Sequence, residues 1–300
     1  MMRTLIRRSP AKINLGLEIL GRRDDGFHEI RSIMARITLA DELEFTVSPS
    51  STGSVASIPP DTGIDPEVNL VNRAIALFNQ QTGLQLTPDV TLRKSIPIAS
   101  GLGGASSNAA TTLSVMNDLA GTVLSDQDLH DLAGRLGSDV PFFLDVSPIA
   151  RVSGRGTEIE SLPPVHGFLV VVTAPIRIPA KTATLYRALD PSDFSCGAMI
   201  EKQVTHIRQT GSLDPSLLNN CFLRPLQQIA PEFSGVIASM QMAGCNHVAL
   251  SGAGPSLYSL FESAREATRV SELLLEQLPA ETFICTTAIE VPQAMRREDH

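Results

Sequence analysis

The stretch from Pro97 to Ala110, with the sequence PIASGLGGASSNAA, constrains the fold of this chain more than any other. Its three glycines, Gly101, Gly103 and Gly104, permit backbone conformations and close approaches that a residue with a Cβ resists. The small residues that follow predict a helix, and the first turn of a helix leaves unpaired N–H groups at the positive end of its dipole. A turn that leads directly into a helix N-terminus is a favourable site for phosphate groups.

The same stretch matches neither of two common phosphate-binding patterns. No Gly-Lys-Ser/Thr closes it as in a Walker A loop, and Ser106 stands where a dinucleotide-binding fingerprint has its third glycine. Taken by itself, the stretch is equally compatible with a phosphate cradle and with a tight strand-to-helix turn that binds nothing. Ser106 and Ser107 add hydroxyl groups that can donate to phosphate or ligate Mg²⁺.

Length and composition define the class of protein. The chain has 300 residues, of which 43% are hydrophobic and 19% charged. These values are typical of a soluble globular protein with room for one large domain or two modest ones, and we expect two. The net charge of -8 and the lack of basic runs argue against nucleic acid or an anionic membrane as a partner. A phosphate ligand would therefore be held by local donors.

Two further features bear on the location of the protein. No segment approaches the ~20 consecutive apolar residues that cross a bilayer, and the first residues leave no room for a secretion signal, so we expect a cytoplasmic protein. The four cysteines form no CxxC pair, and we therefore expect reduced, mostly buried thiols rather than a zinc or redox site. The sequence leaves the oligomeric state open, with a homodimer among the options.

Hydrophobic patterns predict the elements of the first half of the chain. Residues 4–20 alternate and are interrupted by Pro10, which predicts two short strands with Lys12 and Asn14 on one face. The other expected elements are strands over 30–40, 43–47 and 90–95 and helices over 69–81, 107–120 and from the Ser125 cap to near Gly137.

The character of the chain changes after residue 155, and Pro163-Pro164 follows shortly. We therefore predict two domains, residues 1–155 and 156–300. The elements expected in the second domain are strands over 168–173, 247–250, 257–261 and 282–291 and helices over 182–189, within 218–242 and over 262–278. Because strands and helices interleave without strict βαβ alternation, the predicted fold class is α+β.

Five segments together resemble the GHMP kinase superfamily and occur in its order. They are Ser9–Leu15, Asp25–His28, Ile96–Ala109, Gly137–Phe143 and Ser251–Gly254. The resemblance implies an N-terminal ATP-binding domain with a ribosomal-protein-S5-like fold, a C-terminal α/β substrate domain and a cleft between them. Within the superfamily, the chain is similar to members that use ATP and Mg²⁺ to phosphorylate a small alcohol carrying a CDP moiety, in the non-mevalonate route to isoprenoids.

The resemblance implies catalytic and nucleotide-binding residues. Asp139 would accept the proton of the acceptor hydroxyl, and Lys12 would favour the ionised carboxylate and stabilise the developing alkoxide. Asn69 would lie near the adenine. The ATP phosphates would be held by Pro97, Ile98, Ala99, Ser100, Gly101, Leu102, Gly103, Gly104, Ala105, Ser106 and Ser107. The alternatives are a turn-capping aspartate, a solvated strand lysine and a helix-capping asparagine.

The resemblance also implies substrate-binding residues. Phe27, where the family more often has tyrosine, would stack on the cytosine, and His28 would form a hydrogen bond with the edge of the base. Tyr186 would cover the opposite face of the base, Thr182 would lie near the diphosphate, and Asn14 would contact the hydroxyls of the sugar alcohol. A tyrosine in the hydrophobic core is the alternative for Tyr186.

Three points remain open in the sequence. Ala180-Lys181 departs from the short polar pattern that the resemblance predicts there. Gly252 and Gly254 resemble a glycine turn that supports the nucleotide loop, with a plain hairpin as the alternative. The chain is also compatible with another member of the superfamily, such as a homoserine or mevalonate kinase, or with a non-catalytic nucleotide-binding protein. The presence of both Lys12 and Asp139 argues against the last of these.

Overall fold

The computed structural model describes residues 3–48, 51–58 and 69–291. It divides into two compact units, each discontinuous in sequence. The first unit comprises residues 1–11, 39–98 and 103–145, and the second comprises residues 12–38, 99–102 and 146–300. Two long strands, β1 (Arg3–Arg22) and β2 (His28–Val47), and the glycine-rich stretch therefore each contribute residues to both units.

Both long strands run without the interruptions that the sequence suggests. The prediction of two short strands separated at Pro10 was wrong, because β1 is continuous through this residue. β1 pairs with β2 alone among the described strands, and a proline is tolerated on such an edge strand because its missing N–H faces away from the ladder. The predicted break after residue 40 is also absent, because β2 continues through Asp41.

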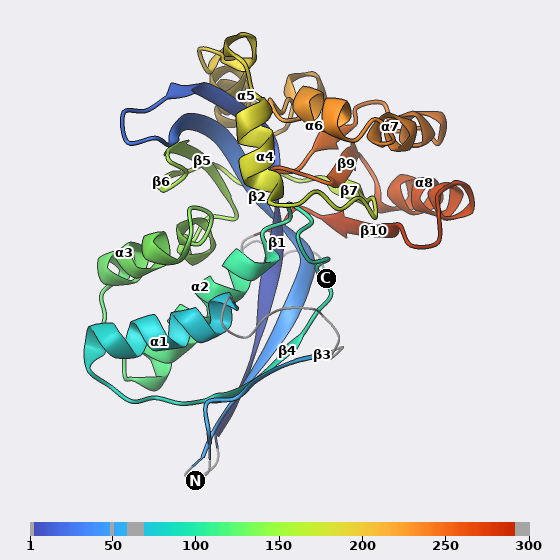
Figure 1. The fold of residues 1–300 in the computed structure, drawn as a ribbon. Coiled ribbons are helices and arrows are strands. Elements are labelled where there is room, and N and C mark those ends of the chain that lie inside the picture. The colour runs from blue at the N-terminus through green and yellow to red at the C-terminus, as the bar shows by residue number, and fades with distance from the viewer. Residues whose placement is uncertain (1–2, 49–50, 59–68, 292–300) are drawn as a thin grey trace. The chain divides into compact units, whose positions relative to one another are not determined.

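The sheet of the first unit is built on the second half of β2. Residues 42–46 pair antiparallel with β4 (Asp89–Arg93), and β4 pairs in parallel with β3 (Val55–Ile58). The α-helices described in this unit, labelled in Figure 1, are α1 (Leu70–Thr82), α2 (Gly104–Leu119) and α3 (Asp126–Leu136). Apolar faces of α1, α2 and α3 pack with β2 and β4 in one hydrophobic core.

Local sequence signals explain where these helices begin and end. The Asn69 side chain accepts a hydrogen bond from the Val71 N–H at 3.0 Å, and α1 ends at Gly83, whose φ of 72° is left-handed. Ser125 and Asp128 form a reciprocal capping box at the start of α3. The predicted helices over 69–81 and from Ser125 are confirmed to within a residue or two at their ends.

A buried carboxylate in the first unit connects the two sides of the glycine-rich stretch. Asp41 is 1% exposed and accepts four hydrogen bonds, from Lys94 Nζ (2.5 Å), Ser95 N (2.8 Å), Ile96 N (2.9 Å) and Asn108 Nδ2 (3.0 Å). Residues 94–96 directly precede the stretch, and Asn108 belongs to α2. One carboxylate therefore fixes both the entry to the stretch and the helix that follows it.

The second unit contains two groups of paired strands. Residues 30–35 of β2 pair antiparallel with β5 (Ile149–Gly154), which pairs with β6 (Glu158–Ser161). A second, four-stranded antiparallel sheet has the order β10-β7-β9-β8. Its strands are β7 (Phe168–Thr173), β8 (Ala249–Leu250), β9 (Ser256–Phe261) and β10 (Phe283–Ala288). The strand predicted over residues 168–173 is confirmed without change.

The α-helices described in the second unit are labelled in Figure 1. They are α4 (Lys181–Ala188), α5 (Ala198–Thr210), α6 (Leu223–Ile229), α7 (Phe233–Met242) and α8 (Ala264–Gln277). α8 packs against β7, β9 and β10, and buried residues of α6, α7 and α8 form one core with this sheet.

The predicted α+β class is confirmed. The pairs β2–β4, β2–β5, β5–β6, β7–β9, β7–β10 and β8–β9 are antiparallel, and β3–β4 is parallel. Each compact unit consists of three separate segments of the chain, whereas the predicted boundary near residue 155 separates two continuous domains. The predicted domains were defined by function, as an ATP-binding and a substrate domain, and this division stays a prediction.

Replacing Asp41 by alanine tests the buried carboxylate. The substitution leaves the Lys94 ammonium group, whose side chain is 8% exposed, without its counter-charge. Removing one partner of a buried ion pair costs about 3–5 kcal/mol, and we expect the free energy of unfolding in urea to fall by that amount.

Asp118→Ala is the matched control. Asp118 lies at the surface of α2, in an exposed pair with Arg7 at 3.7 Å. Such pairs contribute little, so we expect the free energy of unfolding to stay within about 0.5 kcal/mol of the wild-type value. Equal losses in the two variants would show that the buried pair does not stabilise the first unit.

Candidate active site

The candidate site in the second unit begins with two buried polar residues of β1. Lys12 is 3% exposed and Asn14 is 2% exposed, and they share one face of the strand. The Lys12 Nζ donates to Asn14 Oδ1 at 2.6 Å, and Asn14 Nδ2 donates to Ser32 Oγ at 2.7 Å. The Ser32 hydroxyl in turn donates to the Gly16 carbonyl oxygen at 2.6 Å. This chain of hydrogen bonds orients the Lys12 ammonium group.

Residues 99–102 of the glycine-rich stretch are held by backbone hydrogen bonds on two sides. The Lys12 N–H donates to the Leu102 carbonyl oxygen at 2.8 Å, which connects the stretch to β1. The Ser256 N–H donates to the Ser100 carbonyl oxygen at 3.1 Å, and Ser251 Oγ donates to that of Gly101 at 3.0 Å. The stretch therefore lies between β1 and the turn that joins β8 to β9.

Glycine is required where the stretch meets this turn. Gly101 has a φ of +85°, and a Cβ there would lie 2.4 Å from the Ser251 carbonyl oxygen and 2.9 Å from that of Gly254. Gly252 has a φ of +54°, and a Cβ there would lie 3.3 Å from the Lys12 Nζ. The turn connects paired strands, as the hairpin alternative requires, and it also contacts the glycine-rich stretch. Its part in nucleotide binding stays a prediction.

Lys181, which the sequence analysis did not assign to the site, also reaches this place. It is the first residue of α4, and its Nζ donates to the Ala99 carbonyl oxygen at 2.5 Å and to the Gly254 carbonyl oxygen. Burial, with the nearby positive charge of Lys12, lowers the pKa of Lys181 to about 8. The one signal in the sequence was the departure of Ala180-Lys181 from the expected polar pattern.

In the first unit, the glycine-rich stretch continues into α2. Gly103 precedes the helix with a φ of 73°, and no side chain caps the N–H groups of its first turn. Ser107 is fully buried, and its Oγ accepts a hydrogen bond from Ser9 Oγ at 2.7 Å, whereas Ser106 is partly exposed. Of the two serines proposed for Mg²⁺, Ser106 is therefore the accessible one.

Two other predicted residues belong to the first unit. Asp139 lies in the turn between α3 and the short 3-10 helix η1 (Pro141–Leu144), and its side chain is partly exposed. Asn69 caps α1, which is the alternative role that its position suggests. A role for Asn69 near adenine stays a prediction, as does the catalytic role of Asp139.

An aromatic cluster in the second unit connects β2 to α4. The His28 and Tyr186 rings stack at 4.6 Å between centroids, with 29° between their planes. Phe194 and His28 form an edge-to-face pair with 6.2 Å between ring centroids, and Phe222 and Tyr186 form another with 4.9 Å. Burial, assisted by the charge of Arg22, lowers the pKa of His28, so its imidazole is neutral at pH 7 and can both donate and accept a hydrogen bond.

Phe27 and Thr182 lie at the surface of the second unit. The Phe27 side chain is 52% exposed, and the Arg155 guanidinium lies over its ring, 4.5 Å from the centroid. Thr182 is exposed in the first turn of α4, one residue after Lys181. The structure thus brings His28 and Tyr186 together. The half-exposed ring of Phe27 remains accessible on the side that Arg155 does not cover.

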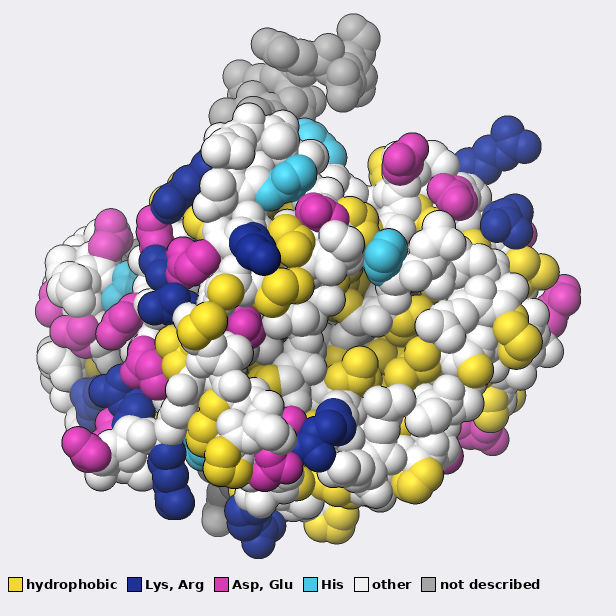
Figure 2. Space-filling view, turned by 90° about the horizontal axis from the view of Figure 1, so that it is seen from above, with side chains coloured by type: hydrophobic (Ala, Val, Ile, Leu, Met, Phe, Trp, Pro, Cys, Tyr) yellow, Lys and Arg dark blue, Asp and Glu magenta, His cyan; other side chains and the backbone are white. Residues whose placement is uncertain are grey.

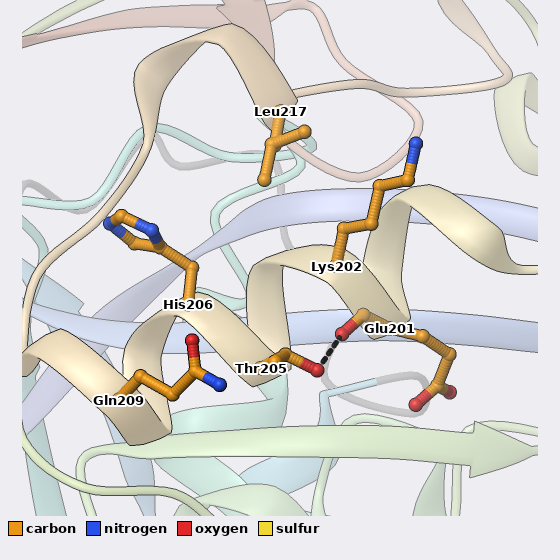
Figure 3. Close-up of a pocket in the computed structure, with 6 residues that line it drawn as sticks. All are labelled: Glu201, Lys202, Thr205, His206, Gln209 and Leu217. Carbon is orange, nitrogen blue, oxygen red and sulfur yellow. Dashed lines mark hydrogen bonds between the residues drawn. The ribbon is translucent and has the colours of Figure 1, made fainter.

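Figure 3 shows a pocket of about 390 Å³ along α5 that none of the predicted residues lines. Its lining residues are Glu201, Lys202, Thr205, His206, Gln209 and Leu217. The carboxylate of Glu201 is engaged with Arg151 at 2.6 Å and Arg31 at 3.2 Å, so it is not available as a base in the pocket.

The surface charges, the metal-binding groups and the lengths of the helices add three observations. On the face drawn in Figure 2, acidic and basic side chains lie interspersed, without a broad patch of one sign. Within the described ranges, no cluster of three or more His, Cys, Asp or Glu side chains is arranged to hold a metal ion. No helix in the same ranges is long and apolar enough to cross a membrane.

Comparisons with known proteins show which family this chain resembles. Residues 69–145 match the family model of the GHMP kinases N terminal domain. A relative from Dehalococcoides mccartyi, named 4-diphosphocytidyl-2-C-methyl-D-erythritol kinase, is 37% identical over 90% of this chain and 93% of its own length. One of the same name from Symbiobacterium thermophilum is 39% identical over 87% of this chain and 92% of its own.

Solved structures give the same result. A crystal structure of 4-(cytidine 5'-diphospho)-2C-methyl-D-erythritol kinase matches with a TM-score of 0.79 and 31% identity, and the match covers 96% of this chain and all of that one. A homoserine kinase from Cytophaga hutchinsonii matches with a TM-score of 0.71 and 17% identity, over 97% of this chain and 95% of that one. The second likeness concerns the fold alone.

The fold, the glycine-rich stretch at the start of α2 and these matches define an ATP-dependent small-molecule kinase of the GHMP kinase superfamily. The sequence-based interpretation of the fold and the superfamily is therefore confirmed. Because relatives well above 30% identity align over more than nine-tenths of their length, the chain belongs to the 4-diphosphocytidyl-2-C-methyl-D-erythritol kinase family.

Replacing Gly101 by alanine tests the contact between the glycine-rich stretch and the turn. A left-handed φ costs about 1–2 kcal/mol in a residue with a side chain, and the new Cβ would overlap backbone atoms that cannot rotate away. We expect the KM for ATP to rise at least about tenfold, measured by steady-state kinetics beside thermal unfolding.

Gly134→Ala provides the comparison. Gly134 lies within α3, and a Cβ there meets nothing within 4 Å. Alanine is the better helix former by about 1 kcal/mol, so this variant should be slightly stabilised with unchanged kinetics. A Gly101→Ala enzyme with the KM and stability of the wild type would show that the close approach is not required.

Proposed function

We propose that the enzyme transfers the γ-phosphoryl group of ATP to the 2-hydroxyl of 4-diphosphocytidyl-2-C-methyl-D-erythritol, in the non-mevalonate route to isoprenoid precursors. One observation carries the chemistry: the buried Lys12 ammonium, oriented by Asn14, lies where Gly252 of the turn meets the glycine-rich stretch. A fixed cation at the phosphate loop is what phosphoryl transfer requires. The relatives support the choice of substrate.

ATP binding falls to the glycine-rich stretch and the start of α2. The N–H groups in the first turn of α2 have no side-chain cap, and the helix dipole favours anions at this end. Residues 97–107 would surround the triphosphate, with glycines where the backbone must approach closely. Asn69 would lie near the adenine while it continues to cap α1.

Mg²⁺ fits this site without a dedicated cluster of carboxylates. Magnesium in kinases usually keeps several waters and binds through substrate phosphates and one or two protein oxygens. The Ser106 hydroxyl is the accessible oxygen at the start of α2, whereas that of Ser107 is buried and bonded to Ser9. When bound there, Mg²⁺ would neutralise charge on the β- and γ-phosphates.

In the transfer step the acceptor hydroxyl oxygen forms a bond to the γ-phosphorus, and the bond to the β–γ bridging oxygen breaks to release ADP. Asp139 accepts the hydroxyl proton, which makes the oxygen a better nucleophile. Lys12 stabilises the negative charge that develops on this oxygen. Asn14 orients Lys12 through the 2.6 Å hydrogen bond and contributes to binding the sugar alcohol.

The cytidyl group would bind at the aromatic cluster. Phe27 offers an exposed ring for stacking on the base, and a neutral His28 can recognise both donors and acceptors on its edge. Tyr186 packs on His28 and so belongs to the same site, and the exposed hydroxyl of Thr182 would bind the diphosphate.

Three further points stay predictions: the boundary between functional domains near residue 155, a cytoplasmic location and a homodimer.

The experiment that tests the proposal is a phosphorylation assay with three acceptors: the CDP-linked methylerythritol, homoserine and mevalonate. We expect turnover of the first alone, and activity only on another acceptor would overturn the assignment. Asp139→Asn should lower kcat about 10²–10⁴-fold, because a general base contributes that much. Asp131→Asn, on the exposed surface of α3, should retain wild-type turnover.

Phe27→Ala tests the cytosine site. Loss of stacking between a base and an aromatic ring costs about 1–3 kcal/mol, which is roughly a 5- to 150-fold rise in KM for the CDP substrate. The KM for ATP should stay within about twofold. Val146→Ala, at a side chain that is 95% exposed, controls for the loss of a surface hydrophobic group. Equal effects on both substrates would contradict the assignment of Phe27 to the cytosine.

A further inference from the structure

Lys181 connects two segments that the proposed mechanism uses. Its Nζ donates to the carbonyl oxygen of Ala99, in the glycine-rich stretch, and to that of Gly254, in the turn between β8 and β9. An ammonium group has three N–H donors, so one remains after these two bonds. Lys181 also begins α4, the helix that carries Thr182 and Tyr186.

The charges around Lys181 favour an anion. Within the described ranges, no carboxylate forms an ion pair with Lys181, and the charged group that acts on it is Lys12 of β1. Residues 99–102 and 251–254, the other segments that contact it, contain no titratable side chain. Two lysines therefore share the same turn, Lys12 beside Gly252 and Lys181 at Gly254. Phosphate oxygens placed between two such cations relieve their mutual repulsion.

We propose that Lys181 is a phosphate-binding residue for phosphoryl transfer, whose ammonium group joins Lys12 in binding phosphate oxygens and also fixes the glycine-rich stretch against the turn. The inference rests on the proposed function, because it assigns Lys181 to the same site. The phosphate oxygens belong either to ATP or to the diphosphate of the CDP-linked substrate. A deprotonated Lys181 would lack the positive charge that strengthens its bonds to the two carbonyl oxygens and attracts phosphate oxygens.

The proposal has a consequence for pH. In the absence of ligand, Lys181 loses its proton near pH 8, whereas a bound phosphate group favours the protonated form and raises the pKa. Ligand binding above pH 8 therefore takes up a proton, and affinity falls as the pH rises. For a group that titrates near 8, the KM should increase by roughly eightfold between pH 7.5 and 9.

Three variants separate this role from simple packing. Lys181→Met keeps most of the side-chain volume and removes the charge, whereas Lys181→Arg keeps a charge that is not lost below pH 12. Lys202→Met removes an exposed lysine from α5 and is the matched control. For each variant, kcat and the KM values for ATP and the CDP substrate are measured from pH 7.5 to 9, beside thermal unfolding.

We expect Lys181→Met to raise one or both KM values at least about tenfold and to abolish the pH dependence. The substrate whose KM changes identifies the source of the phosphate oxygens. Lys181→Arg should stay within a few-fold of the wild type at pH 7.5 and lose the increase toward pH 9, because its charge persists. Lys202→Met should behave as the wild type. Wild-type KM values and pH profiles in Lys181→Met would overturn the proposal.

Calorimetry keeps the test decisive if Lys181→Met does not fold. ADP and the CDP substrate are each titrated at pH 8.5 in buffers of different ionisation enthalpy, which reports the protons taken up on binding. Wild type should take up a fraction of a proton with one of the two ligands, and Lys181→Arg should take up none. Equal uptake in the two proteins would overturn the role of Lys181. Because ADP binding needs no turnover, this result is independent of whether the CDP compound is the true acceptor.

Discussion

The close approach of Gly101 to the turn between β8 and β9 is the contact on which the candidate site depends. A Cβ at this position would lie 2.4 Å from the Ser251 carbonyl oxygen, so the two backbones touch without intervening side chains. The contact brings together segments about 150 residues apart in the chain, and Lys12 and Lys181 both reach the same turn. Backbone atoms move little, so the turn that both lysines reach is held in place by the main chain.

Lys181 is held by neutral oxygens. Its Nζ donates to two backbone carbonyls, whereas Lys94 in the first unit pairs with the carboxylate of Asp41. A partial negative charge orients an ammonium group without cancelling its charge. The positive charge of Lys181 consequently remains available to a phosphorylated ligand, although the protein as a whole carries a net charge of -8.

The sequence predicted the motifs and their order better than the contacts between them. The helix capped by Ser125 and the strand over residues 168–173 follow from local signals, and the structure contains both. Pro10 was misinterpreted because its effect depends on whether a strand lies at an edge, which sequence periodicity does not reveal. Lys181 was missed because its partners are backbone carbonyls of Ala99 and Gly254, and main-chain acceptors leave no mark on residue type.

The uninterrupted course of β1 makes residue spacing as important as residue identity. The Ser9 hydroxyl donates a hydrogen bond to Ser107 at the start of α2, and Lys12, three residues later, lies in the candidate site. Ala11 and Ile13, on either side of Lys12 in the sequence, are fully buried. Side chains alternate between the two faces of a strand, so the loss or gain of one residue exchanges every later position. An insertion in this segment would move Lys12 and Asn14 to the face that Ile13 and Leu15 now occupy. Lineages of this enzyme should therefore vary in length at their loops and keep a constant length between Ser9 and Asn14.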